Sequence, residues 1–297
     1  MKRVWLAAVA VIVVLVGAAL SGPTPSRTEQ PAAPAAVQMR VELQQGRVDE
    51  VRHTVQIAMN NDGPAKITVV QVELQAPSFK GGAGPVTVDA PLPVGGLRVD
   101  VPVSYGTGIC TGDDLKPRSA ASHVAFKVRT EDGQVHALRL PLASPNAMLD
   151  KLLAIDCQQA YLDRQATFTF GPWTPLPSGW VTGTVVVKRV GFPGTITLQE
   201  FTGSILLEVM PIPLREATPK PYGVLKPGED ELRIPIIVDG ERCTPHALAE
   251  IKKPYVFPAF VSLDGGDPLY TELKITDVEV AAFKPVIDAC AAGYTQM

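Results

Sequence analysis

Two stretches decide the fold: Cys110-Thr111 with Ile155-Asp156-Cys157, and Cys243-Thr244 with Ile287-Asp288-Ala289-Cys290. They contain all four cysteines of the chain, and the two cysteines of each stretch stand at the same separation. In each copy the first cysteine precedes a threonine, and the second follows an Ile-Asp step and is trailed by a small residue and a tyrosine. This matched pattern predicts two tandem units derived from one duplicated domain.

The cysteines are predicted to form disulfides. Their number is even, no Cys-x-x-Cys occurs, and matched cysteines outside the cytoplasm are typical of a disulfide framework. Four cysteines allow three pairings, and the repeat favours Cys110 with Cys157 and Cys243 with Cys290, one bridge in each unit. In the chain-entropy model each such loop contributes ~4 kcal/mol to stability.

The amino terminus predicts export. Lys2 and Arg3 precede an uncharged apolar run over residues 4–20. A single membrane anchor, assigned to residues 1–22, needs about 20 apolar residues or as few as roughly 17, and residues 4–22 just reach this length. A cleaved signal peptide is the alternative, with Ala19-Leu20-Ser21 as the cut. Both alternatives put the body outside the cytoplasm, either on the cell membrane behind one anchor or secreted after cleavage.

Composition limits the possible classes of protein. Apolar residues are 46% and charged residues 19%, which is typical of folded globular domains. The formal net charge of −3 argues against nucleic acid as a partner, because its phosphates attract clustered Lys and Arg. Residues 23–36 are rich in Pro and Ala and are interpreted as an extended linker.

Period-two alternation begins at Val37 and predicts strands over residues 37–44, 51–59, 70–75 and 97–105. Residues 80–84 are expected to form a flexible glycine loop. Asp132-Gly133 between two alternating runs predicts a hairpin. Ser144-Pro145 predicts the start of a short helix that leads toward Cys157.

The second unit repeats this order, with strands predicted over residues 166–170, 181–190, 195–201 and 205–210. We therefore predict a mainly β protein of tandem, duplicated antiparallel β-sandwiches, at residues 37–161 and 165–297, each with a short helix and one disulfide. The expected variety is immunoglobulin-like or fibronectin-like. The immunoglobulin pattern itself is missing, because no Trp lies between the cysteines of either pair. The joint over residues 162–165 is very short.

No catalytic motif, metal site or cofactor site is predicted. The histidines lack metal-ligand spacing, and the two on alternating apolar faces, His53 and His136, are interpreted as structural. Asp264-Gly265-Gly266-Asp267 and the acidic residues 229–231 are interpreted as solvated turns, since neither has the spacing of a calcium loop. Dispersed carboxylates that converge in the fold remain an open alternative.

One surface candidate emerges from residues 171–180, where Trp173 and Trp180 stand in a proline-rich loop. Two rigid indoles can form a platform for a sugar, a peptide or another protein. The alternative, which we favour, is that the pair packs against the first unit or caps the sandwich.

The sequence therefore predicts a non-enzymatic, extracytoplasmic protein of the binding or adhesion type, with an envelope protein or glycan as its partner. Fold alone does not fix function. Two alternatives stay open: a hydrolase that acts on an envelope polymer through dispersed carboxylates, and a structural accessory subunit of a membrane complex.

Overall fold

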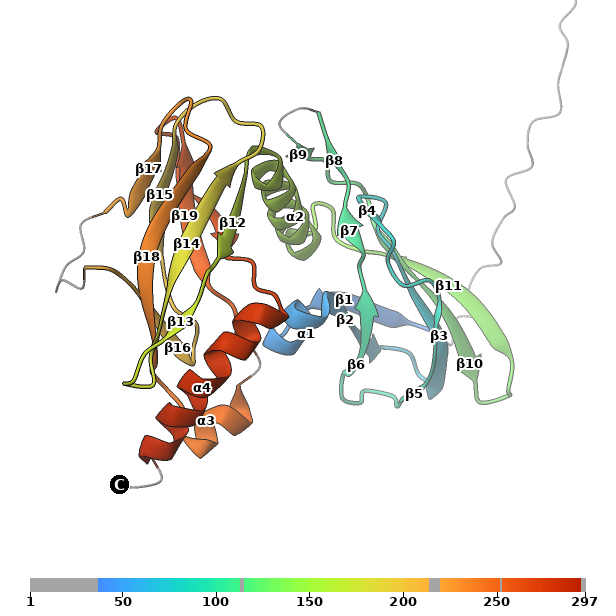
Figure 1. Ribbon diagram of the computed structural model, residues 1–297. Helices are drawn as coiled ribbons and strands as arrows, with labels where there is room; N and C mark the ends of the chain where they lie inside the picture. The colour runs from blue at the N-terminus through green and yellow to red at the C-terminus, as the bar shows by residue number, and fades with distance from the viewer. Residues whose placement is uncertain (1–36, 113–114, 214–219, 252, 295–297) are drawn as a thin grey trace, which may run out of the picture. The chain divides into compact units, whose positions relative to one another are not determined.

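The computed structural model describes residues 37–112, 115–213, 220–251 and 253–294 of the chain. This part is mainly β, with several antiparallel sheets, four helices and two disulfides (Figure 1). The predicted anchor or signal and the linker lie outside the described residues. Among the described helices, none has the length and apolar character needed to cross a membrane.

The first half contains two main sheets, with strand orders β1-β2-β6 and β11-β10-β3-β5. Two short pairs, β4 with β7 and β8 with β9, accompany them. The bounds are β1 (Met39–Gln44), β2 (Thr54–Asn61), β3 (Ile67–Gln75), β4 (Phe79–Lys80), β5 (Val86–Leu92), β6 (Val99–Ser104), β7 (Thr107–Gly108), β8 (Cys110–Thr111), β9 (Lys116–Pro117), β10 (His123–Thr130) and β11 (Val135–Pro141).

The second half also contains two main sheets, ordered β12-β14-β18-β16 and β17-β15-β19-β20, with β13 added beside β14. The bounds are β12 (Ala166–Phe170), β13 (Thr174–Pro175), β14 (Val181–Arg189), β15 (Ile196–Phe201), β16 (Leu207–Pro211), β17 (Gly223–Leu225), β18 (Glu231–Gly240), β19 (Pro258–Leu263) and β20 (Leu269–Glu272).

The strand pairings of the second half repeat those of the first. The order β1-β2-β6 corresponds to β12-β14-β18, and β11-β10-β3-β5 corresponds to β20-β19-β15-β17. The short β4 pairs with β7 directly after β6, as β16 pairs with the last part of the longer β18. These six pairings therefore follow one plan in both halves, except that β6 and β7 are separate strands in the first half and one continuous strand, β18, in the second.

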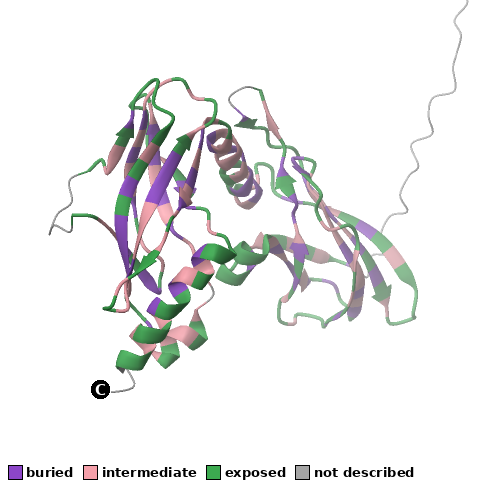
Figure 2. Ribbon diagram, viewed as in Figure 1, coloured by how far each residue is buried: buried purple, intermediate pink, exposed green. Residues whose placement is uncertain are grey.

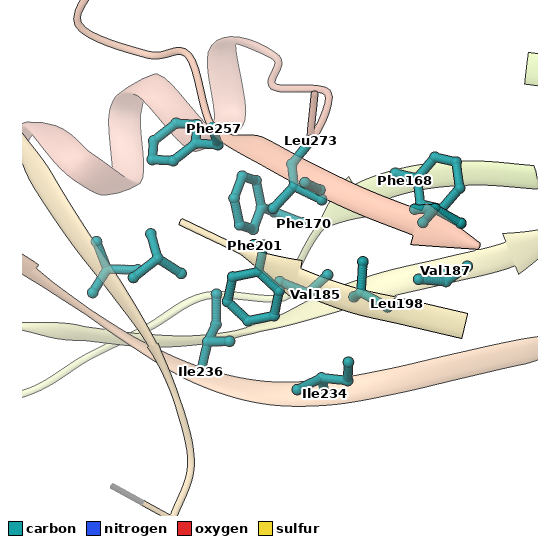
Figure 3. Packing of buried hydrophobic residues seen from close by; sticks show 14 of the residues in the cluster. Phe168, Phe170, Val185, Val187, Leu198, Phe201, Ile234, Ile236, Phe257 and Leu273 are labelled. Atoms are coloured by element: carbon teal, nitrogen blue, oxygen red, sulfur yellow. The ribbon is translucent and has the colours of Figure 1, made fainter. Parts of the chain in front are cut away.

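Each half has its own hydrophobic core, built from alternating residues of both its main sheets. In the second half Phe168, Val185 and Ile234 come from one sheet and Leu198 and Phe201 from the other (Figure 3). Figure 2 shows buried residues alternating with exposed ones along these strands. A fully buried side chain of this size contributes about 1.5–3 kcal/mol, so the alternation read from sequence is also what holds the sheets together.

The helices depart from the predicted pattern of one short helix in each unit. Their bounds are α1 (Arg47–Arg52), α2 (Ala147–Gln165), α3 (Pro245–Glu250) and α4 (Asp277–Tyr294). The helix α2 has 19 residues and α4 has 18. The predicted joint over residues 162–165 is the last turn of α2, which runs directly into β12.

Three local predictions differ from the structure at their boundaries. The predicted strand over residues 51–59 starts at Thr54, because α1 occupies the residues before it. The cap of α2 is the Asn146 side chain, which accepts a hydrogen bond from the backbone of Leu149 at 3.1 Å, rather than Ser144. The predicted glycine loop at residues 80–84 begins inside a strand, since Lys80 belongs to β4.

The predicted disulfides are confirmed: Cys110 bonds Cys157 and Cys243 bonds Cys290, with Cα atoms 5.4 and 5.6 Å apart. In both halves the second cysteine lies in the long helix, α2 or α4. A glycine stands shortly before each first cysteine, where an added Cβ would lie 2.9 Å from the Cβ of Asp156 (at Gly108) or 2.4 Å from that of Cys290 (at Gly240). Glycine therefore lets each bridged helix approach its strand closely.

Candidate functional site

A groove of about 770 Å³ lies between α2 and the segment that contains β20. This volume is in the range of pockets that hold small ligands or short chains. The groove is lined from α2 by Ile155, Asp156, Gln158 and Gln159, and on the other wall by Tyr255, Tyr270, Glu272, Leu273, Lys274 and Ile275.

Helical spacing explains the α2 wall. Ile155, Gln158 and Gln159 stand at positions i, i+3 and i+4, so they share one face, whereas Leu152 and Cys157 are buried. The Asp156 side chain is held in place by β7, because its Oδ2 accepts the backbone N–H of Gly108 at 2.7 Å. The wall is therefore anchored to the first half close to the disulfide.

Strand alternation explains the β20 wall. Tyr270 and Glu272 are exposed, whereas Thr271 between them is fully buried. The Tyr270 hydroxyl donates to Glu272 Oε1 at 2.7 Å, and its ring lies against Phe260 of the neighbouring β19, with centroids 5.8 Å apart. Tyr270 and Glu272 are thus held in place on one face of the strand.

Polar contacts join the two walls. Gln158 Nε2 donates to the carbonyl of Tyr270 at 2.8 Å, and Thr271 Oγ1 donates to Gln159 Oε1 at 3.2 Å. Lys274 Nζ pairs with Asp163 Oδ1 at 2.7 Å. β20 is the last strand of its sheet, and these contacts hold α2 beside part of its outer edge.

The carboxylates around the groove make its electrostatic environment negative. Burial raises the pKa of Tyr105 to about 12, and the charge of Asp156 adds to the rise. Burial also raises the pKa of Tyr270 well above its usual value, as do the hydrogen bond to Glu272 and the charges of Glu272 and Glu50. Both phenols are therefore neutral at physiological pH and remain hydrogen-bond donors.

The helix α1, which has no helical counterpart in the second half, contributes a further carboxylate. Glu50 of α1 forms an ion pair with Lys253. At the end of α1, His53 adopts a left-handed conformation (φ 55°); its Nε2 lies 2.6 Å from the carbonyl oxygen of Gly106 and its Nδ1 3.0 Å from the Tyr105 hydroxyl. His53 is thus an exposed cap residue with both nitrogens hydrogen-bonded, rather than a strand residue on an apolar face.

The two predicted platform residues occupy different environments. Trp173 packs on the core of the second half: its ring centroid lies 4.8 Å from that of Phe283 and 5.4 Å from that of Phe170, and the indole covers Gly183. Trp180 is half-buried, and the described aromatic contacts include no ring partner for it. A binding role for these residues stays a prediction.

The predicted acidic turns serve local roles. Asp264 Oδ1 accepts the backbone N–H of Thr195 at 2.7 Å, and Glu229 Oε2 accepts that of Lys226 at 2.7 Å. Within the described ranges, His, Cys, Asp and Glu side chains do not gather in groups of three or more that fit a metal ion.

Comparisons with known proteins add no functional assignment. No protein-family model and no curated protein sequence matches the chain. The exo-chitosanase CsxA of Amycolatopsis orientalis is 12% identical with a TM-score of 0.18, over 78% of this chain and 26% of that one. Red sea bream transglutaminase is 10% identical with a TM-score of 0.20, over 80% and 31%. The calcium-binding domain CBD12 of CALX1.1 is 12% identical with a TM-score of 0.19, over 78% and 80%.

This chain thus spans about a quarter to a third of the length of the first two proteins. TM-scores this low establish no shared function.

Proposed function

We propose that the chain is an extracytoplasmic binding protein made of two tandem, duplicated β-sandwich units, at residues 37–161 and 165–297. The repeated plan of strand pairings supports the duplication. In each half a sheet that contains the order β1-β2-β6 or β12-β14-β18 shares one core with a four-stranded sheet, which supports an immunoglobulin-like or fibronectin-like sandwich. A parallel bridge between Thr169 of β12 and Lys274, which follows β20, joins the two main sheets of the second unit at one edge.

The cysteines and the amino-terminal sequence support the proposed extracytoplasmic compartment. Both disulfides favour an oxidising compartment. We propose that residues 4–20 hold the body on the outer side of the cell membrane, with residues 23–36 as a spacer, or alternatively that they direct secretion and are removed.

The observation that carries the proposed binding function is the groove between α2 and β20. It combines a partly exposed apolar residue, Ile155, with tyrosine hydroxyls and glutamine amides on fixed elements. Concave sites of mixed character on rigid elements are typical ligand sites. We propose that an envelope protein or glycan binds here.

The test compares two matched substitutions in the full-length, detergent-purified protein. Ile155→Trp fills the groove, and Val135→Trp adds the same bulk at the exposed first residue of β11; the two native side chains are 47% and 54% exposed. Envelope proteins and glycans retained by the wild type should be lost with Ile155→Trp and kept with Val135→Trp. Equal retention by both variants contradicts the assignment of the groove.

A second candidate function is favoured by one observation: Asp156 and Glu272 line facing walls of this groove. Hydrolysis of glycosidic bonds commonly uses two such carboxyl groups. If the protein is a hydrolase, it will release soluble fragments from purified envelope polysaccharide, and Asp156→Asn and Glu272→Gln will each abolish the release. Absence of any release by the folded wild type eliminates this candidate.

A further inference from the structure

We infer that the groove between α2 and β20 binds a cationic ligand, an extended peptide segment that presents a Lys or Arg side chain. This inference rests on the proposed binding function and names the chemistry of its ligand. It is carried by the charges, the tyrosines and the backbone of the groove walls.

The charges of the groove are not balanced. Lys274 lines the groove and pairs with Asp163, and Lys253 pairs with Glu50. Asp156 and Glu272 line the groove from opposite walls, and neither has a cationic partner among the described residues. Their hydrogen bonds in this part of the chain use Asp156 Oδ2 and Glu272 Oε1. One carboxylate oxygen on each wall is therefore available to a ligand.

Tyrosine rings add a second feature that favours a cation. Tyr255 and Tyr270 both line the groove, and an ammonium or guanidinium group gains energy over such a ring. The raised pKa values of Tyr105 and Tyr270 have the charges of Asp156, Glu272 and Glu50 among their causes, as expected for a negative potential. An anionic ligand would meet repulsion at both walls.

The backbone of β20 favours a peptide over a free amine. The N–H of Leu273 donates toward β19, to the carbonyl of Phe257 at 2.9 Å. Because adjacent residues of a strand point their backbone groups to opposite sides, those of Glu272 and Tyr270 point away from β19. The Tyr270 carbonyl accordingly accepts the Gln158 amide from α2. The Lys274 N–H on the same side donates to the carbonyl of Phe168, so the Tyr270 N–H and the backbone groups of Glu272 are the ones that remain for an extended chain, as in strand addition.

The experiment measures fluorescence anisotropy of labelled hexapeptides with the full-length protein in detergent. The probe is Val-Thr-Arg-Thr-Val-Thr, compared with the same peptide carrying neutral citrulline, or glutamate, in place of arginine. Asp156→Asn and Glu272→Gln keep the size and hydrogen-bonding oxygen of each side chain. Asp288→Asn is the control, since Asp288 pairs with Lys284 on the exposed side of α4.

We expect the arginine peptide to bind about tenfold more tightly than the citrulline peptide, because a hydrogen bond between two charged groups is stronger than one to a neutral group and solvent screens part of the difference. Each groove variant should weaken the arginine peptide about three- to tenfold, with Asp288→Asn unchanged. Added salt should weaken the arginine peptide alone.

Three results overturn the inference. Equal binding of the arginine and citrulline peptides removes the role of charge while leaving the groove as a binding site. Competition by spermidine as effective as that by the arginine peptide removes the role of the peptide backbone. Failure of every peptide to bind refutes a peptide ligand, whereas the proposed function is judged separately by the retention of envelope material with Ile155→Trp.

Discussion

The contact between Trp173 and Gly183 offers a direct test of whether the indole packs inside the second half. Gly183 lies on β14 in the same alternation as the buried Val181 and Val185, and a Cβ added to it would meet the Trp173 ring at 2.4 Å. The missing side chain of Gly183 thus makes the space that the indole fills. A tryptophan used as a free binding platform would not fill a space left by a glycine of the neighbouring strand.

The magnitudes follow from this geometry. Truncation of a buried Trp to Ala costs about 3–5 kcal/mol, and since Trp173 is half-buried we expect Trp173→Ala to cost about 2–3 kcal/mol. This corresponds to a melting temperature lower by roughly 5–10 °C. Gly183→Ala should cost about 1–3 kcal/mol by overpacking. In the Trp173→Ala background the same substitution should cost almost nothing, because the clashing ring is gone.

The assay is a double-mutant cycle of denaturant unfolding, with Trp180→Ala as the control. A coupling energy of about 1–3 kcal/mol between Trp173 and Gly183 is expected, while Trp180→Ala changes stability by less than about 1 kcal/mol. If Gly183→Ala is equally destabilising in both backgrounds, or if Trp173→Ala leaves the melting temperature unchanged, the indole does not pack as described.

Three further outcomes are expected. Gly240→Ala should cost about 1–3 kcal/mol in denaturant unfolding, because its Cβ would lie 2.4 Å from that of Cys290, whereas Gly84→Ala, with no atom within 4 Å, should cost little. Folding raises the pKa of Tyr105 from 10.0 to about 12. The resulting stabilisation of the folded state is fully present below pH 10 and is lost as the pH rises to about 12. Tyr105→Phe should therefore remove up to about 2–3 kcal/mol of the pH dependence of unfolding in this window. Asp49→Ala should lower the melting temperature through a loss of about 1–2 kcal/mol, because Asp49 accepts the backbone N–H before α1 and two side-chain donors; an unchanged melt contradicts this role.

The features that the sequence predicted well are those set by local pattern. Alternation located most strands, Asp132-Gly133 located the turn between β10 and β11, and the repeat identified both disulfide pairs. The predicted start of the second strand at Val51 was wrong, because Val51 belongs to α1 and its side chain is 56% exposed. Its place in the period-two pattern is a coincidence. A hydrophobic period constrains the fold only where burial enforces it.

The groove was not predicted, for a physical reason. Gln158 and Tyr270 are 112 residues apart, and their contact depends on how α2 meets the edge of β20. The i, i+3, i+4 spacing of Ile155, Gln158 and Gln159 was a usable signal, but only for a helix that extends beyond Cys157. Because only a short helix was predicted, the α2 wall of the groove could not be located from the sequence.

The positions where the two halves differ point to the same region. The connection between the first two strands is α1 in one half and the loop containing Trp173 in the other. The Trp173 indole of the loop packs on the core of its own half, whereas Glu50 of α1 forms an ion pair with Lys253 of the second half. Under the proposed duplication, selection for a ligand acts on the elements that the two units do not share. By this criterion α1 and the face of α2 that carries Gln158 are the elements to vary when the ligand of the groove is sought.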